Sequence, residues 1–411
     1  MSATDATPRS ATNRIGALDL LRGVAILGTF GTNAWLFAHP GGPTIVLTEG
    51  FAEGGSVETA LRFLANGKFL ALLTLLFGVG LELQYRSAVR RGAPWPGRYP
   101  VRAAILFVEG LVHYVLVFEF DVLMGYAITS LLVAYLVGRS DRAVRAWMIG
   151  VGGFFGTAIL ALTALLLALP DDPAGPAPID PGATASWPTQ VAARLDGFLL
   201  YRMEIVIIVP SAIVLFLLGS RLLRAGAFDD TTTGARLRVR LMVLGLGVGL
   251  PANALTAFAG PAWVLVDRYL LPPLVALGLL GLVTTLALRA RSAPGMIRRG
   301  ITAVGRTALS CYVLQNVTAS VLCFGWGFGL ASRLAGARPW WVIGLWAGVG
   351  VLCTVLATLW LRRFDRGPLE LVAHRVHEIG RTPPRGPQYA HDALSCLKAG
   401  EANDATEGAT C

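Results

Sequence analysis

Long apolar runs, separated by short polar connections, follow one another along almost the whole chain. A helix rises about 1.5 Å per residue, so about 20 apolar residues cross the roughly 30 Å of hydrocarbon in a bilayer. Runs of this length predict ten membrane-spanning helices, at residues 17–38, 61–83, 101–119, 121–138, 146–169, 203–222, 240–259, 264–288, 302–330 and 341–361. We therefore predict an all-α, polytopic membrane helix bundle of about ten transmembrane helices.

The two ends of the chain depart from this pattern. Residues 1–13 are polar and rich in Ser, Thr and Ala, and the last part of the chain is polar and contains Gly and Pro. Segments of this composition bury too little apolar surface to fold. We predict a transmembrane domain at residues 14–377 between two disordered tails, at residues 1–13 and 378–411.

Charge alternates between the connections. The one after the first run holds Glu49, Glu53 and Glu58 and no Lys or Arg, and the one after the fifth run holds Asp171, Asp172 and Asp180. The connections in between are rich in arginine, at residues 86–98, 139–145, 221–240 and 289–299. Because short arginine-rich loops stay in the cytoplasm, the pattern predicts that both termini are cytoplasmic.

Composition narrows the class of protein further. The 411 residues are 54% hydrophobic and 15% charged, whereas about a quarter of the residues in a soluble domain are charged. The net charge of +10 does not indicate a nucleic-acid partner, because the basic residues lie between apolar runs and not on one exposed face. The five Cys have no spacing typical of a disulfide framework or a metal site, so we expect no bound metal or cofactor. The expected partner is the lipid bilayer.

The third run carries the most informative ionisable residues. Glu109 and His113 are four residues apart and share one helix face, and Glu119 and Asp121 follow in a tight outer hairpin. Imidazole titrates near neutral pH, so a histidine oriented by a carboxylate is a common general base. The pattern predicts that His113 is a catalytic base supported by Asp121 or Glu119. The alternative is a histidine that only bonds its neighbours in the bundle.

Other polar residues lie inside or at the ends of the apolar runs, where ionisable groups are costly and often functional. Asp19 and Arg22 share a face of the first run, and Arg22 suits the phosphates of a cytosolic donor; a local ion pair is the alternative. Further candidates for substrate or donor binding are Asn33, Lys68, Glu109, Arg306, Tyr312 and Gln315. Hydrogen bonds between helices, or a lysine that reaches the interface, explain them equally well. Glu204, Asp267 and Arg268 are expected to border an outer vestibule.

Four sequence blocks resemble the YeiB-like family of bacterial membrane proteins, catalogued as domain of unknown function 418. They are LDLLRGVAILG at 18–28, KFLALLTLLFGVGL at 68–81, GLVHYVLVFEFDVLMGYA at 110–127, and VGRTALSCYVLQN at 304–316 with WLRRFDRGPLE at 360–370. The chain departs from the family pattern at Phe120, usually Gly, and at Cys311, often Asn. The resemblance implies a multi-pass protein of the bacterial plasma (inner) membrane.

The first helix of this family is similar to those of the type 3 acyltransferases and heparan glucosaminide acetyltransferases. That distant resemblance implies transfer of an acyl group from a cytosolic acyl-CoA-type donor to a hydroxyl or amine of a small-molecule or glycan acceptor. The donor would bind near Arg22 and Arg306, and His113 would deprotonate the acceptor. An inner-membrane transporter or exporter with Lys68, Glu109 and His113 as a proton relay is the alternative, and a structural or sensory component is a third. The oligomeric state is not indicated by the sequence.

Overall fold

A computed structural model describes residues 8–43, 55–169, 186–290 and 295–378. Within these ranges every regular element is a helix. Eight helical segments among the described residues are long and apolar enough to cross a membrane, and two shorter apolar helices, Leu123–Leu136 and Ala308–Cys323, accompany them. The predicted all-α, polytopic helix bundle is confirmed.

The chain divides into two units, Met1–Leu371 and Val372–Cys411. The helices are α1 Pro8–Phe37, α2 Ser56–Ala65, α3 Lys68–Arg90, α4 Tyr99–Leu116, α5 Leu123–Leu136, α6 Asp141–Ala168, α8 Trp187–Asp196, α9 Phe198–Arg202, α10 Glu204–Arg224, α11 Thr232–Met242, η2 Val243–Gly249, α12 Leu250–Ala257, η3 Pro261–Trp263, η4 Val266–Leu270, α13 Pro272–Arg289, α14 Met296–Arg306, α15 Ala308–Cys323, α16 Leu330–Arg333, η5 Ala335–Ala337, α17 Trp340–Trp360 and α18 Pro368–Glu378. Because α1 begins at Pro8, residues 8–13 of the tail predicted to be disordered are helical. Residues 1–7 and 379–411 lie outside the described ranges.

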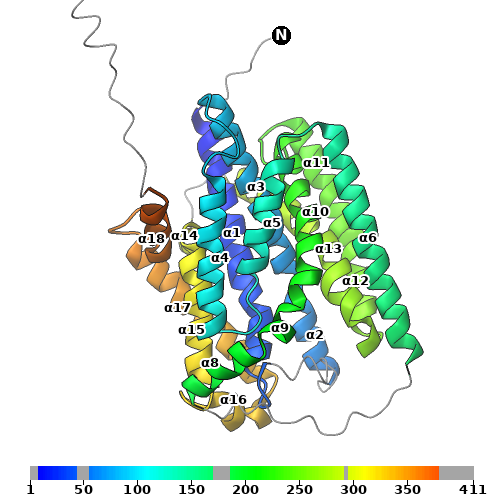
Figure 1. Cartoon of the computed structure of the whole chain (residues 1–411), viewed down its shortest axis with the longest axis vertical. Helices are drawn as coiled ribbons and strands as arrows, with labels where there is room; N and C mark the ends of the chain where they lie inside the picture. Colours follow the sequence, from blue (N-terminus) through cyan, green and yellow to red (C-terminus); the bar gives the residue numbers. More distant parts are fainter. Residues whose placement is uncertain (1–7, 44–54, 170–185, 291–294, 379–411) are drawn as a thin grey trace, which may run out of the picture. The chain divides into compact units, whose positions relative to one another are not determined.

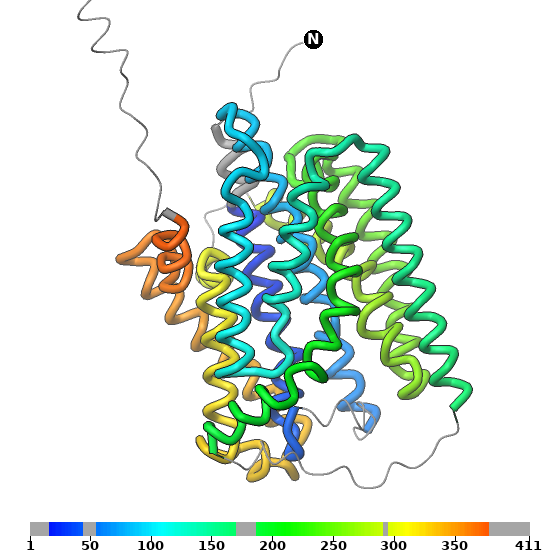
Figure 2. The backbone as a smooth tube through the Cα atoms, in the orientation of Figure 1, coloured from blue at the N-terminus to red at the C-terminus, as the bar shows by residue number. Residues whose placement is uncertain are grey.

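In the first unit, successive long helices run in alternating directions. The connections from α3 to α4, α5 to α6 and α10 to α11 gather at one end, drawn at the top of Figure 1. These connections hold the arginines that predict a cytoplasmic location. We call this the arginine-rich end and the opposite end the outer end. The trace in Figure 2 shows α8 and α9 at the outer end, beyond the α4–α5 hairpin.

Two of the predicted spans are broken at polar residues. The run at 61–83 divides at Asn66 and Gly67 into α2 and α3, and Gly67 has φ +69°. The run at 302–330 divides at Thr307 into α14 and α15. Near the start of α15, Glu370 Oε1 accepts the backbone N–H groups of Leu309, at 2.8 Å, and Ser310. The length of an apolar run does not show whether the helix within it is continuous, so these breaks could not be predicted from hydrophobicity.

Helices α3 and α10 pack with their backbones in contact. A Cβ atom added to Gly78 would lie 2.0 Å from the carbonyl oxygen of Phe216, and one added to Gly219 would lie 2.1 Å from that of Leu75. Such distances are far below van der Waals contact, so small residues are required for this close approach.

We expect Gly219→Ala to destabilise the bundle by about 1–3 kcal/mol, because the added methyl group forces two helices apart. Thermal unfolding in detergent measures the change. Gly153→Ala on α6, where nothing lies within 4 Å of the added Cβ, is the matched control and should leave stability the same or slightly higher. Equal midpoints for both variants would contradict the close packing.

Candidate functional site

His113 and Asp121 form a buried pair in the outer half of the bundle. His113 lies in the last turn of α4, and Asp121 lies in the hairpin that leads to α5. The ring Nδ1 and the Asp121 Oδ2 are 2.8 Å apart, and the two side chains are 2% and 0% exposed. Asp121 Oδ1 accepts the backbone N–H of Leu123 at 2.9 Å, which fixes the carboxylate at the start of α5. The structure thus brings together the two residues that were predicted to act as base and orienting acid.

The other ring nitrogen of His113 faces an amide. Asn316 Nδ2, from α15, lies 3.3 Å from His113 Nε2, and Asn316 Oδ1 accepts from Asn33 Nδ2 of α1 at 3.1 Å. With the Asn316 amide nitrogen at Nε2, the contact requires Nε2 to accept, which puts the ring proton on Nδ1, toward Asp121. In this arrangement Nε2 is unprotonated, as a general base requires.

Tyr312 and Gln315 lie on α15 close to Asn316 in sequence. The Tyr312 hydroxyl donates to Asp121 Oδ2 at 3.3 Å, and its ring centroid is 5.1 Å from that of His113. Gln315 is 1% exposed, and its amide nitrogen and oxygen have no hydrogen-bond partner among the described residues. Buried side-chain amides are nearly always bonded, so Gln315 brings an unused donor and acceptor to this part of α15.

Glu119 does not bond the histidine. Its Oε1 accepts from Arg194 Nε of α8 at 2.8 Å, and the Arg194 side chain is 1% exposed. Arg202 of α9 donates to the backbone carbonyls of Asp121, at 3.1 Å, and of Glu119, and it lies over the Tyr114 ring. Of the two carboxylates proposed to support His113, the structure places only Asp121 at the ring, while Glu119 fixes the hairpin against α8.

Neither Glu109 nor Lys68 forms a hydrogen bond with the His113 ring. The contact predicted between Glu109 and His113 is not a hydrogen bond of the ring, since the two ring nitrogens face Asp121 and Asn316. Lys68 begins α3, is 2% exposed, and bonds the carbonyl oxygen of Phe63. Lys68 therefore belongs to the break between α2 and α3 and does not extend to solvent.

A second group of predicted residues lies at the arginine-rich end. Arg22 bonds Asp19 at 3.1 Å, with side chains 33% and 16% exposed. Gly305, the neighbour of Arg306, packs against the carbonyl oxygen of Asp19, and Arg306 donates to the backbone carbonyl of Asp365 at 3.1 Å. The structure thus brings α1 and the end of α14 together near these two arginines. Along α1, Arg22 and Asn33 are separated by about 16 Å of helix.

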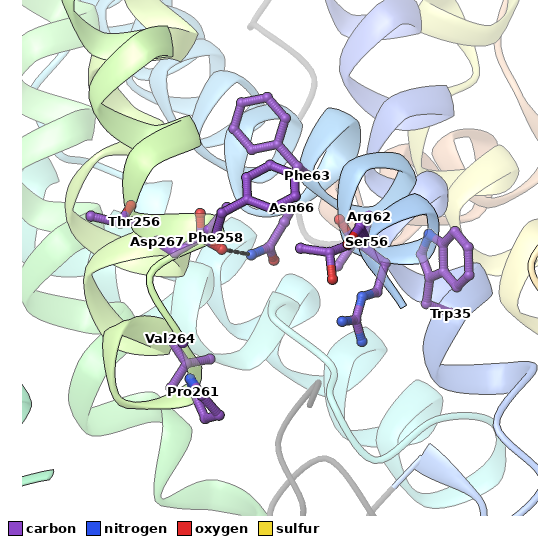
Figure 3. Close-up of a pocket in the computed structure, with 14 residues that line it drawn as sticks. Trp35, Ser56, Arg62, Phe63, Asn66, Thr256, Phe258, Pro261, Val264 and Asp267 are labelled. Carbon is purple, nitrogen blue, oxygen red and sulfur yellow. Dashed lines mark hydrogen bonds between the residues drawn. The ribbon is translucent and has the colours of Figure 1, made fainter. Parts of the chain in front are cut away.

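An outer cavity of about 310 Å³ opens beside the break between α2 and α3. It is lined by residues of α1, α2 and the segment from α12 to η4, as Figure 3 shows. Asp267 lies on its wall and accepts from the amides of Asn66, at 2.6 Å, and Asn253, at 2.7 Å. Arg268 bonds Asn66 Oδ1 at 3.1 Å. Of the three residues expected to border an outer vestibule, Asp267 lines this hollow, whereas Glu204 and Arg268 are not among its lining residues.

Two arginines that bond the hairpin could not be identified from the sequence. Arg194 of α8 lies in a stretch that reads only as an amphipathic surface segment at residues 191–201, and Arg202 of α9 lies between that stretch and the predicted span at 203–222. A signal was present, because Glu119 and Asp121 in one short hairpin between apolar runs require nearby positive charge. The sequence does not say which arginine supplies it.

Comparison with known proteins gives relatives without an assigned activity. Residues 222–379 match the family model "Protein of unknown function (DUF418)". The chain is 22% identical to "Uncharacterized protein YxaH" of Bacillus subtilis (strain 168), over 88% of this chain and 94% of the relative. It is 26% identical to "Uncharacterized protein YeiB" of Escherichia coli (strain K12), over 86% of this chain and 93% of the relative. The resemblance to the acyltransferase clan is not tested by these matches and stays a prediction.

Proposed function

We propose that this chain, which belongs to the YeiB-like DUF418 family of membrane proteins, is a plasma-membrane acyltransferase with His113 as its general base. The acyl group would pass from an acyl-CoA-type donor to a hydroxyl or amine of a small-molecule or glycan acceptor. The observation that carries the proposal is the buried Asp121–His113 pair, whose Nε2 accepts a hydrogen bond from Asn316. This is the protonation state in which a histidine can take a proton from an acceptor.

The reaction begins when the acceptor hydroxyl replaces the Asn316 amide as the partner of His113 Nε2. The acceptor oxygen attacks the thioester carbonyl carbon, and Nε2 takes the hydroxyl proton. Asp121 stabilises the imidazolium through the Nδ1–H bond, as the acid does in a catalytic triad. The C–S bond then breaks, and Nε2 returns the proton to the leaving thiolate. The products are the acylated acceptor and a free thiol, and the imidazole is neutral again.

One side chain of α15 is suited to stabilise the oxyanion of the intermediate. Such stabilisation needs preorganised donors in a site that excludes water. Gln315 has an unused, buried amide N–H₂, whereas the single hydroxyl hydrogen of Tyr312 is donated to Asp121. In the proposal Gln315 therefore keeps the substrate-binding role that the sequence pattern predicts, and Tyr312 orients the Asp121 carboxylate.

The donor would enter from the arginine-rich end. Arg22 and Arg306 offer guanidinium groups to its phosphates, a contact that is strong when bidentate. From Arg22 a thioester on a flexible arm would have to extend about 16 Å along α1 to reach the level of Asn33. His113 is 3% exposed, so the acceptor gains Nε2 only by moving the Asn316 side chain.

The test uses purified protein in lipid nanodiscs with acetyl-CoA labelled in the acetyl group. Glucosamine, glucose, glycerol and ethanolamine serve as acceptors, and palmitoyl-CoA labelled in the palmitoyl group replaces acetyl-CoA in a parallel series. We expect release of free thiol that depends on the acceptor, and label in the acceptor. Label that stays in the donor with every acceptor and both donors would overturn the proposal.

An exporter driven by protons is the second candidate. It is favoured by the buried His113–Asp121 pair, since Asp and His groups inside a membrane form proton relays in transporters. Proteoliposomes loaded with labelled glucosamine distinguish the two functions. Counterflow of unmodified glucosamine would support the exporter, and chemical modification without counterflow would support the enzyme.

A further inference from the structure

The wall of the outer cavity carries no net charge. Arg62 and Asp267 are the charged residues that line it, and their charges cancel. Behind the wall, Glu58 lies 3.8 Å from Arg62 and is bonded by Arg338 at 2.7 Å, which adds one charge of each sign. Because burying an ion without a counter-charge is costly, this balance favours an uncharged occupant over an anion or a cation.

Three side chains of the wall have unused capacity to accept hydrogen bonds. Thr32 and Thr256 each give the hydroxyl hydrogen to a backbone carbonyl at 3.1 Å, so their oxygens can accept from a ligand but cannot donate to it. Asp267 accepts one amide on each carboxylate oxygen, and each of these oxygens can accept a second hydrogen. The wall is therefore suited to a ligand that carries O–H or N–H donors.

Two donors of the wall are not used within the described residues. Trp35 is 5% exposed and lines the cavity, and its indole N–H makes no hydrogen bond to any residue that the structure describes. The same holds for the hydroxyl of Ser56, which begins α2. Figure 3 shows these two residues on one side of the cavity and Thr256 and Asp267 on the other. A hydroxyl group both donates and accepts, so a compound with several hydroxyls matches both sides.

The cavity also adjoins a break in a membrane-spanning segment. Asn66 lines it and ends α2, and the following Gly67 has φ +69° before α3 begins. Non-helical backbone at membrane depth is tolerated only where protein buries it or where it lines a cavity, and broken helices of this kind form substrate sites in transporters. The rings of Phe63 and Phe258 add apolar surface to the same wall, as is usual in sites for small molecules.

We propose that the outer cavity binds an uncharged polyhydroxyl compound of about the size of one sugar ring. Hydroxyl groups of the ligand donate to Asp267 and accept from Trp35 and Ser56. Its C–H groups pack on the rings of Phe63 and Phe258. The volume of about 310 Å³ lies at the lower end of the range for small-molecule sites. The site uses none of the His113 cluster, so it goes beyond acyl transfer and stands whether or not that reaction occurs.

The test measures binding to the full-length protein in phosphatidylcholine nanodiscs by saturation-transfer difference NMR, without an acyl donor and with empty nanodiscs as background. The uncharged probes are methyl glucoside, methyl galactoside, methyl mannoside and myo-inositol. Methyl glucuronide and glucosamine are the anionic and cationic probes. We expect at least one uncharged probe to bind saturably and about 10-fold or more tighter than both charged sugars. No saturable binding of any uncharged probe, or equal affinity for a charged sugar, would overturn the proposal.

Two matched pairs of variants locate the binding. Ala257→Trp fills the cavity that Ala257 lines and should abolish binding, whereas Ala259→Trp, at an exposed position that does not line it, should leave binding unchanged. Thr256→Val removes one acceptor and should weaken binding about 3- to 10-fold. Thr302→Val on α14, whose hydroxyl also bonds its own helix, should not weaken it.

Thermal unfolding shows whether each variant is folded. Wild-type affinity in folded Ala257→Trp would contradict the site. If Ala257→Trp does not fold, Thr256→Val decides the outcome, because unchanged binding by that variant, or equal losses in Thr256→Val and Thr302→Val, would place the bound compound elsewhere.

Discussion

Replacing Asp121 with Asn is expected to lower the rate of acyl transfer about 10²- to 10⁴-fold while the bundle stays folded. The substitution keeps the size of the side chain, and the amide oxygen can still accept the N–H of Leu123. The amide nitrogen would then donate to His113 Nδ1 and move the ring proton to Nε2. A protonated Nε2 opposes the Asn316 amide and cannot take a proton from the acceptor.

The measurement is the initial rate of label transfer in nanodiscs, with thermal unfolding as the check on folding. His113→Gln should show a loss of similar size, since it removes the base itself. Tyr312→Phe is the matched comparison, because it removes one of the donors to Asp121 and leaves the ring proton on Nδ1. Its rate should fall less than 10²-fold. Wild-type rates for both Asp121→Asn and His113→Gln would remove His113 from the mechanism.

The kinetic constants of one variant distinguish an effect on the chemical step from an effect on acceptor binding. For Asp121→Asn we expect kcat to fall while KM changes little, because the carboxylate stabilises charge that develops only in the transition state. A rise in KM at constant kcat would instead assign Asp121 to acceptor binding.

The contacts of His113 show how much of the site could be predicted from the sequence. The pairing with Asp121 could be predicted because the two residues are joined by one short hairpin between two apolar runs, which leaves few arrangements. The pairing of Asn33 with Asn316 spans 283 positions, and any of several polar residues could have met Asn33 across the bundle. The proton position on the ring depends on that distant amide and so could not be predicted.

The same distinction applies to the fold. Segment length and charge alternation predict a polytopic helix bundle, because hydrocarbon accepts a backbone only when its polar groups bond internally. The breaks at Asn66 and Thr307 depend on the close approach of other segments, such as Glu370 at the start of α15. The outer cavity next to Asn66 is a consequence of one of these breaks, so its position follows from tertiary packing.

Arg194→Met is expected to destabilise the protein by about 3–5 kcal/mol, because it leaves the Glu119 carboxylate buried without its charged partner. The Glu119 side chain is 8% exposed, and its second oxygen has no partner among the described residues. Arg194 also donates to the carbonyl of Val115 at 3.3 Å, so its loss removes one of the hydrogen bonds that join the end of α4 to α8. Thermal unfolding in detergent measures the loss.

The double variant Glu119→Gln with Arg194→Met should recover much of this stability, since no uncompensated charge is then buried. Equal destabilisation in the single and double variants would show that the Val115 contact or the packing of Arg194, and not the ion pair, holds the hairpin. The single variant Glu119→Gln tests the alternative role of this residue. If Glu119 only fixes the hairpin, label transfer in the folded single and double variants should stay within about 10-fold of wild type. A loss as large as the 10²- to 10⁴-fold expected for Asp121→Asn would place Glu119 among the catalytic groups.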